Sequence, residues 1–91
     1  MNQQIQFNDQ LQVDMQQHHL SFTALVAGQK VGCYIALPAL AHLANAEITT
    51  QEQAIQAFEQ HRFDLEDEAE TLIEEENFDA QGRIWLQHPA I

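Results

Sequence analysis

Acidic side chains dominate the chemistry that this sequence offers, and nearly all of them lie between residues 51 and 79. This segment contains eleven aspartate and glutamate residues and one basic residue, Arg62, so it carries −10 of the chain's net charge of −11. Paired carboxylates act as general acid and base only where a pocket drives their pKa values apart. Because these carboxylates recur along one segment, the pattern favours a solvated helix face, with Glu66, Glu70 and Glu74 as candidate partner-binding residues.

Arg62 is the one positive charge in this acidic segment, and its helical phase places it on the apolar side. One interpretation is a structural ion pair, in which the stem packs on the core and the guanidinium binds Glu59 and Glu66. The other is an anion-binding or ligand-binding arginine in a cleft between helix and sheet. The sequence leaves both interpretations open.

Histidine and cysteine show no pattern typical of a metal site or a nucleophile. His18 and His19 are adjacent, so in a strand they would point to opposite faces, and no His-x-x-x-His or Cys-x-x-Cys spacing occurs. Cys33 fits the core face of a strand, without the positive surroundings that stabilise a thiolate. We therefore predict no metal, no cofactor and no catalytic residues. An enzyme with Arg62 in a carboxylate pocket is the disfavoured alternative.

Three aromatic residues are candidates for a contact surface. Phe63 falls among the acidic residues, and Tyr34 and Trp85 fall on the sheet face opposite to the predicted core. With Leu25, Tyr34 and Trp85 would form a patch for a protein partner or for a second copy of the chain, so a homodimer is an alternative.

The charge balance restricts the partners that the protein can bind. Three basic residues are too few to contact a phosphate backbone, and an anionic membrane surface would repel the chain. We therefore predict a protein partner with a basic surface, no direct nucleic-acid contact and no membrane contact. The first residues lack the regions of a signal peptide, and a single cysteine forms no internal disulfide, which together predict a cytoplasmic location.

The elements that position these residues follow from hydrophobic spacing, and the length of the chain predicts a single domain over residues 1–91. Residues 5–7 alternate as a short strand, and residues 11–15 alternate more weakly as a further extended segment. Residues 83–87 form the last predicted strand.

A hairpin is the clearest prediction. Residues 20–27 and 30–37 both alternate, and a two-residue turn at Gly28-Gln29 would pair Ala24 with Cys33. This register places all apolar pairs on one face, whereas a slip of one residue would move them to the opposite face.

Two helices complete the fold. Pro38 predicts the start of a short helix that stops near Asn45. Thr49 and Glu52 have the spacing of a capping box for a second helix, which extends to Glu76 and is either continuous or bent near residues 61–64. Its apolar stripe consists of Ala54, Ile55, Phe58, Leu65, Ala69, Leu72 and Ile73.

The resulting order is β-β-β-α-α-β, which predicts an α+β fold: a small antiparallel sheet with a short helix and a long acidic helix packed on one face.

The spacing of these core and turn positions resembles a family of short proteobacterial proteins known as a domain of unknown function. The matching positions span nearly the whole chain: Ile5-x-Phe7, Phe22-x-Ala24, Gly28, Cys33-x-Ile35, Leu40, Phe58-x-x-x-Arg62, Leu65-Glu66, Ala69, Ile73 and Gly82. The chain departs from the Asp-Gly pairs common at both tight turns of that family, with Ala27-Gly28 and Gln81-Gly82 instead. The resemblance supports the fold and implies no activity and no functional residues.

These observations favour a small acidic, non-enzymatic interaction or regulatory protein of the bacterial cytoplasm that binds a protein partner or itself. One alternative is a nucleic-acid mimic, in which the carboxylates of residues 51–79 occupy the basic groove of a DNA-binding, RNA-binding or transcription protein. A second alternative is a small anion-binding or ligand-binding domain centred on Arg62.

Overall fold

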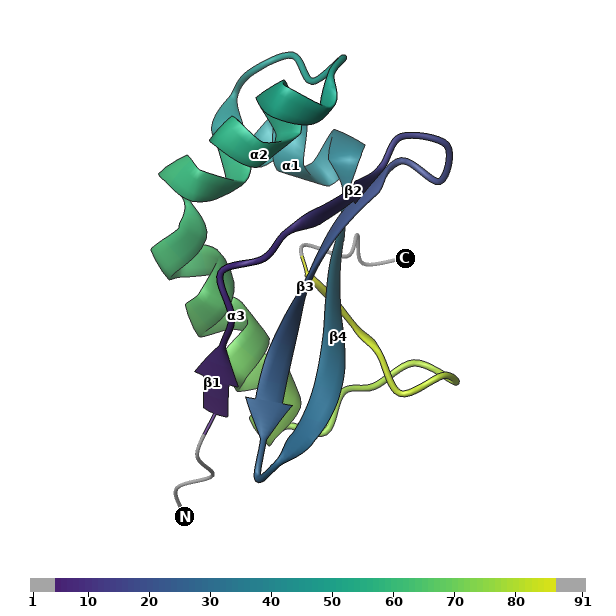
Figure 1. Cartoon of the computed structure of the whole chain (residues 1–91), viewed down its shortest axis with the longest axis vertical. Coiled ribbons are helices and arrows are strands. Elements are labelled where there is room, and N and C mark those ends of the chain that lie inside the picture. The colour runs from purple at the N-terminus through teal and green to yellow at the C-terminus, as the bar shows by residue number, and fades with distance from the viewer. Residues whose placement is uncertain (1–4, 87–91) are drawn as a thin grey trace.

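In the part of the chain that the structure describes, a mixed sheet of five strands carries three helices along one side (Figure 1). The computed structural model describes residues 5–86. The elements in chain order are β1 (Ile5–Phe7), β2 (Gln12–Asp14), β3 (His19–Val26), β4 (Gln29–Ala36), α1 (Leu37–Ala44), α2 (Gln51–Gln60), α3 (Arg62–Glu74) and β5 (Ile84–Leu86). The α+β class is confirmed, and the weakly alternating segment around residue 13 is a strand, so four strands precede the helices.

The strand order in the sheet is β1-β3-β4-β5, with β2 also paired to β3, and the predicted antiparallel sheet proves to be mixed. β1, β2 and β4 all pair with β3 in antiparallel fashion, but β5 pairs with β4 in parallel. The helices between β4 and β5 return the chain to the end of the sheet where β4 begins, so β5 runs in the same direction as β4. Hydrophobic spacing identifies a strand but carries no information about its direction.

The hairpin of β3 and β4 exists, but its predicted register was wrong by two residues. Val26 lies opposite Gln29 and Ala24 opposite Val31, so the turn consists of Ala27 and Gly28. These two residues have φ values of 51° and 86°, as a type I′ turn requires, and this turn matches the twist of the strands. A shift of two residues leaves every side chain on its predicted face, which is why the predicted core face was nevertheless correct.

The helix ends follow local capping chemistry. Asn45 ends α1 with φ 52° and ψ 48°, the left-handed conformation that was predicted there. The capping box of α2 lies one residue later than predicted, at Thr50 and Gln53 rather than Thr49 and Glu52. The N–H of Gln53 donates to Thr50 Oγ1 at 3.1 Å, and Gln53 Oε1 accepts from the N–H of Thr50 at 3.2 Å.

The long acidic helix is two helices, separated at His61, where a bend was considered. His61 has φ −122° and ψ 18°, and its N–H donates to the carbonyl of Phe58 instead of the residue four positions back. The break lets α2 and α3 lie at different angles over the sheet, as Figure 1 shows.

The core lies between the helices and the sheet face that β3, β4 and β5 turn toward them. Its buried side chains are Leu20, Phe22, Ala24, Cys33, Ile35, Leu37, Leu40, Ala54, Ala57, Phe58, Leu65, Ala69, Ile73, Ile84 and Leu86. Ala57 is absent from the predicted stripe, whereas Ile55 and Leu72, which were included in it, are half-buried. Within residues 5–86, no helix is both long and apolar enough to cross a membrane.

Candidate functional site

Arg62, at the first position of α3, is held by carboxylates on both sides. Its Nη2 lies 2.7 Å from Glu59 Oε2, its Nε donates to Glu59 Oε1 at 2.8 Å, and its Nη1 lies 3.2 Å from Glu66 Oε2. The guanidinium carbon also lies 5.2 Å from the centre of the Phe58 ring. Hydrogen bonds from Arg62 lower the pKa of Glu59, and the same bonds raise that of Arg62 above its usual range. This geometry supports the structural ion pair, which joins the end of α2 to the start of α3.

A groove of about 340 Å³ runs between β1 and α3, and we call it the acidic groove. Its lining residues are Phe7, Phe63, Asp64, Glu66, Asp67 and Glu70. Phe63 is 89% exposed, although it is a large apolar residue. Three of the predicted partner-binding residues, Phe63, Glu66 and Glu70, therefore come together here, whereas Glu74 does not line the groove.

Asp64, Asp67 and Phe7 also line the acidic groove, although they were not named among the predicted partner-binding residues. The two aspartates could have been found, because Asp67 follows Phe63 by four positions and Asp64 precedes Asp67 by three, spacings at which helical side chains are neighbours. Phe7 could not, because it joins the groove only through the pairing of β1 with β3 and the packing of α3 over the sheet.

The predicted sheet-face aromatics form a cluster on the side of the sheet away from the core. The ring centres of Tyr34 and Trp85 are 5.1 Å apart, and the ring of His19 stands edge-on to both. The guanidinium carbon of Arg83 lies 5.2 Å from the Tyr34 ring centre and 5.5 Å from that of Trp85. Because the protein's own arginine stacks on these rings, the cluster is engaged in internal packing, while Leu25 is exposed on the same face.

Asp79 holds the turn that leads into this cluster. Its Oδ1 accepts from the N–H groups of Gln81 and Arg83 at 2.9 and 2.8 Å, and its Oδ2 accepts from Arg83 Nε and Trp85 Nε1 at 2.9 and 3.0 Å. The hydrogen bond from the Arg83 backbone is the largest cause that lowers the pKa of Asp79, and the bonds from Trp85, Gln81 and the Arg83 side chain act in the same direction.

We predict that Asp79→Asn destabilises the fold at neutral pH. An asparagine oxygen can replace Oδ1, but its NH₂ group would then face the donors of Arg83 and Trp85. Because the folded-state pKa is lowered, the contribution of Asp79 is full above its unfolded pKa, near 4, and is lost as pH falls through the lower folded value. The stability gap between wild type and variant should therefore be constant near pH 7 and shrink below about pH 4.

Urea unfolding followed by Trp85 fluorescence at pH 7 and pH 3 measures this gap. Asp9→Asn is the matched control, because it makes the same chemical change at an exposed position outside the turn. Equal stability of the two variants at pH 7 would contradict the assigned role of Asp79.

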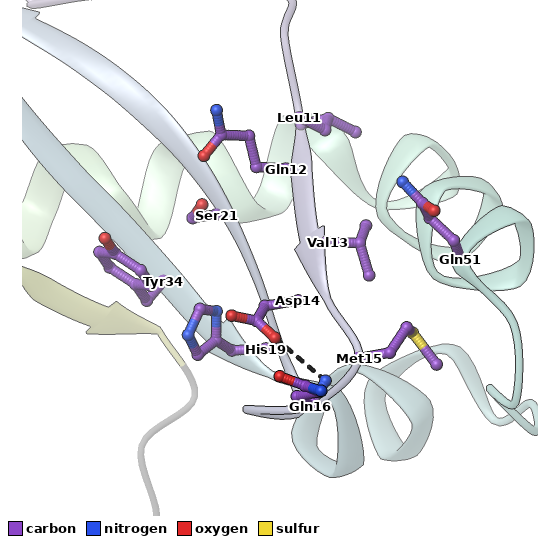
Figure 2. Close-up of a pocket in the computed structure, with 10 residues that line it drawn as sticks. All are labelled: Leu11, Gln12, Val13, Asp14, Met15, Gln16, His19, Ser21, Tyr34 and Gln51. Atoms are coloured by element: carbon purple, nitrogen blue, oxygen red, sulfur yellow. Dashed lines mark hydrogen bonds between the residues drawn. The ribbon is translucent and has the colours of Figure 1, made fainter.

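A second hollow, of about 680 Å³, surrounds β2 (Figure 2). Figure 2 shows that β2 divides it: Gln12 and Asp14 lie on the side of Ser21, His19 and Tyr34, while Leu11, Val13 and Met15 point toward α2. Asp14 Oδ1 accepts from the N–H groups of Gln16 and Gln17, both at 3.0 Å, so this carboxylate caps the turn after β2. Of the predicted site residues, the hollow includes Tyr34.

Cys33 lies in the core, and burial raises the pKa of its thiol to about 12. A thiol with this pKa is protonated at neutral pH and is a poor nucleophile. Among residues 5–86, no group of three or more histidine, cysteine, aspartate or glutamate side chains is placed to hold a metal ion.

Comparisons of the sequence and the structure with known proteins identify the family of this chain. The chain is 44% identical to the uncharacterized protein YrdB of Escherichia coli and 43% identical to that of Shigella flexneri, each over 86 residues that cover 94% of this chain and 99% of the relative. A crystal structure of a protein of unknown function from Shewanella loihica has a TM-score of 0.91 and 48% identity, and the match covers 97% of both chains. Residues 5–86 match the family described as "Protein of unknown function (DUF1488)". The chain belongs to this DUF1488 family.

Proposed function

We propose that this protein is a non-enzymatic interaction module of the cytoplasm, and that its acidic groove binds a basic segment of a protein partner. The observation that carries the proposal is the position of Phe63, an almost fully exposed phenyl ring in a groove with four carboxylates.

An exposed phenylalanine gains free energy when a partner covers it. Burying a phenylalanine side chain is worth about 1.5–3 kcal/mol, and this gain remains available in the free protein because Phe63 packs on little of its own fold. By contrast, Phe58, five residues earlier, is fully buried. Large aromatic residues in partly formed pockets are typical anchors of protein interfaces.

The carboxylates around Phe63 determine the charge of the partner. Arg62 neutralises part of the charge of Glu66, but no ion pair within residues 5–86 engages Asp64, Asp67 or Glu70. A basic segment would meet all three, and the field of the acidic helix would accelerate its association. A second copy of the chain would bring the same negative charge to the groove, which disfavours a homodimer at this surface.

Phe63 also distinguishes the proposed function from a nucleic-acid mimic. Both proposals use the carboxylates of α3 and a basic partner, but a phosphate backbone has no counterpart of a central exposed phenyl ring. The acidic groove therefore favours a partner segment in which an apolar residue lies among basic ones.

Replacing Phe63 by alanine should weaken binding of such a segment by about tenfold, because part of the apolar burial is lost. The probe is a labelled synthetic peptide whose central leucine is flanked, two residues away on each side, by lysine, with threonine at the other positions. Fluorescence anisotropy at low salt measures its affinity.

Phe78→Ala is the matched control for Phe63→Ala. Phe78 is 39% exposed and does not line the acidic groove, so its replacement should leave the affinity for the peptide unchanged. Equal affinities of the two variants would show that the peptide binds by charge alone and would overturn the proposed anchor role of Phe63.

A further inference from the structure

The acidic groove has an edge strand as one wall and a helix as the other. β1 is the outermost strand of the sheet order, and Phe7 at its end shares the groove with Phe63 and the carboxylates of α3. Figure 1 shows β1 beside α3, at the side of the sheet away from β4. An exposed edge strand is a template on which an extended segment of another chain can form hydrogen bonds.

The register of β1 identifies the backbone groups that face this groove. The N–H of Asn8 donates to the carbonyl of Thr23 at 3.3 Å, so Asn8 occupies a hydrogen-bonded position opposite β3. In an antiparallel pair these positions alternate, so Gln6 also bonds toward β3, while Ile5 and Phe7 direct their N–H and C=O groups outward. No strand within residues 5–86 pairs with this outer side of β1.

We infer that the basic segment binds as an added strand along β1, with alternate side chains directed into the acidic groove. This inference rests on the proposed function and specifies how the partner is held. The ring of Phe7 packs at 5.9 Å from that of Phe22 on the core side of the sheet, so a residue paired with Phe7 would face the same side and meet Phe63. Side chains two positions away in the added strand share that face.

The recognised pattern is therefore basic-x-apolar-x-basic. Two basic residues four positions apart in a strand are about 13 Å apart, at roughly 3.3 Å per residue. Asp64 and Glu70 are separated by about 9 Å along the helix axis, at 1.5 Å per residue. Phe63 precedes both carboxylates on the helix, Asp64 by about 1.5 Å and Glu70 by about 10.5 Å along its axis. One basic residue therefore lies on the side of Glu70, while the flexible stem of the other reaches back to Asp64 beside Phe63, and the central apolar residue contacts the phenyl ring.

Backbone N-methylation of the lysine-leucine peptide tests the inference, because a methyl group removes one hydrogen-bond donor and blocks close approach to the edge. Two methylated peptides are compared, one modified at the leucine and both lysines, the other at the threonines that alternate with them. Since only one alternate set of N–H groups can face β1 in a given strand direction, one peptide should lose about tenfold or more in affinity, while the other retains it.

The amide protons of the protein give an independent readout. Hydrogen exchange at the Phe7 N–H should slow when the unmodified peptide binds, whereas the Gln6 N–H, already bonded to β3, should change little. Equal affinities of the two methylated peptides, whether both retained or both reduced, would overturn strand addition. If the unmodified peptide still bound and its binding still depended on Phe63, only strand addition would be overturned and the proposed function would stand. If binding of the unmodified peptide did not depend on Phe63, both the strand addition and the proposed function would be overturned.

Discussion

Phe58→Ala is expected to destabilise the protein by about 3–5 kcal/mol, because a fully buried ring would be replaced by a cavity. The ring centre of Phe58 lies 5.0 Å from that of Phe22, and the guanidinium carbon of Arg62 lies 5.2 Å from the Phe58 ring centre. A domain of this length has a free energy of unfolding of roughly 5–14 kcal/mol, so the loss is a large share of the total. The melting temperature should fall by roughly 15–30 °C.

Phe63→Ala is the matched control, since it removes the same side chain five residues later from an 89% exposed position. Its stability should stay within about 0.5 kcal/mol of wild type. Urea unfolding followed by circular dichroism compares the two variants. A difference of less than about 1 kcal/mol between them would contradict the assignment of Phe58 to the core and of Phe63 to the surface.

Neutralising the unpaired carboxylates of the acidic groove should have the largest effect on binding. The triple variant Asp64→Asn, Asp67→Asn, Glu70→Gln keeps the shape of the side chains but removes three charges that face the peptide. The lysine-leucine peptide has two lysines, so at about 0.5–1 kcal/mol for each charge pair its affinity should fall about 5- to 30-fold at low salt. The loss should lie mainly in the association rate and should vanish near 1 M salt, where the screening length is about 3 Å.

A second triple variant, Glu47→Gln, Glu74→Gln, Glu75→Gln, controls for net charge. It removes the same number of charges from exposed positions that do not line the acidic groove. Stopped-flow association rates and equilibrium titrations compare the two variants. If both lower the affinity equally, the peptide responds to the overall charge of the protein, and the groove is not its site.

The hairpin and the helices show which parts of this fold local chemistry determines. Alternation in β3 and β4 correctly assigned their core face, because alternate residues of a strand lie on the same face and a shift of two residues does not change that face. The register itself depended on Ala27, which adopts a positive φ that the sequence rule assigns to glycine or asparagine. His61 likewise bears no breaker signal, yet α2 ends and α3 begins on either side of it, with α2 in contact with β2 and α3 with β5.

Only the residues of the acidic groove that lie on α3 could be predicted from the sequence, because local spacing relates them to one another. Phe63, Glu66 and Glu70 share one helix, so their spacing alone brings them near each other. Phe7 is contributed by a strand at the opposite end of the chain, and no periodicity relates it to α3. Arg62, placed on the apolar stripe by its phase, is half-buried over Phe58 while its guanidinium reaches Glu59 and Glu66.

The parallel pairing of β4 with β5 has a consequence for the order in which the molecule folds. The hairpin of β3 and β4 joins neighbouring segments and can close early, but Ile84 and Leu86 enter the core only after the whole helical segment has been synthesised. Contacts between residues so distant in sequence slow the search for the native state. On the ribosome, the hairpin and helices would therefore wait with an incomplete core until β5 emerges and docks beside β4.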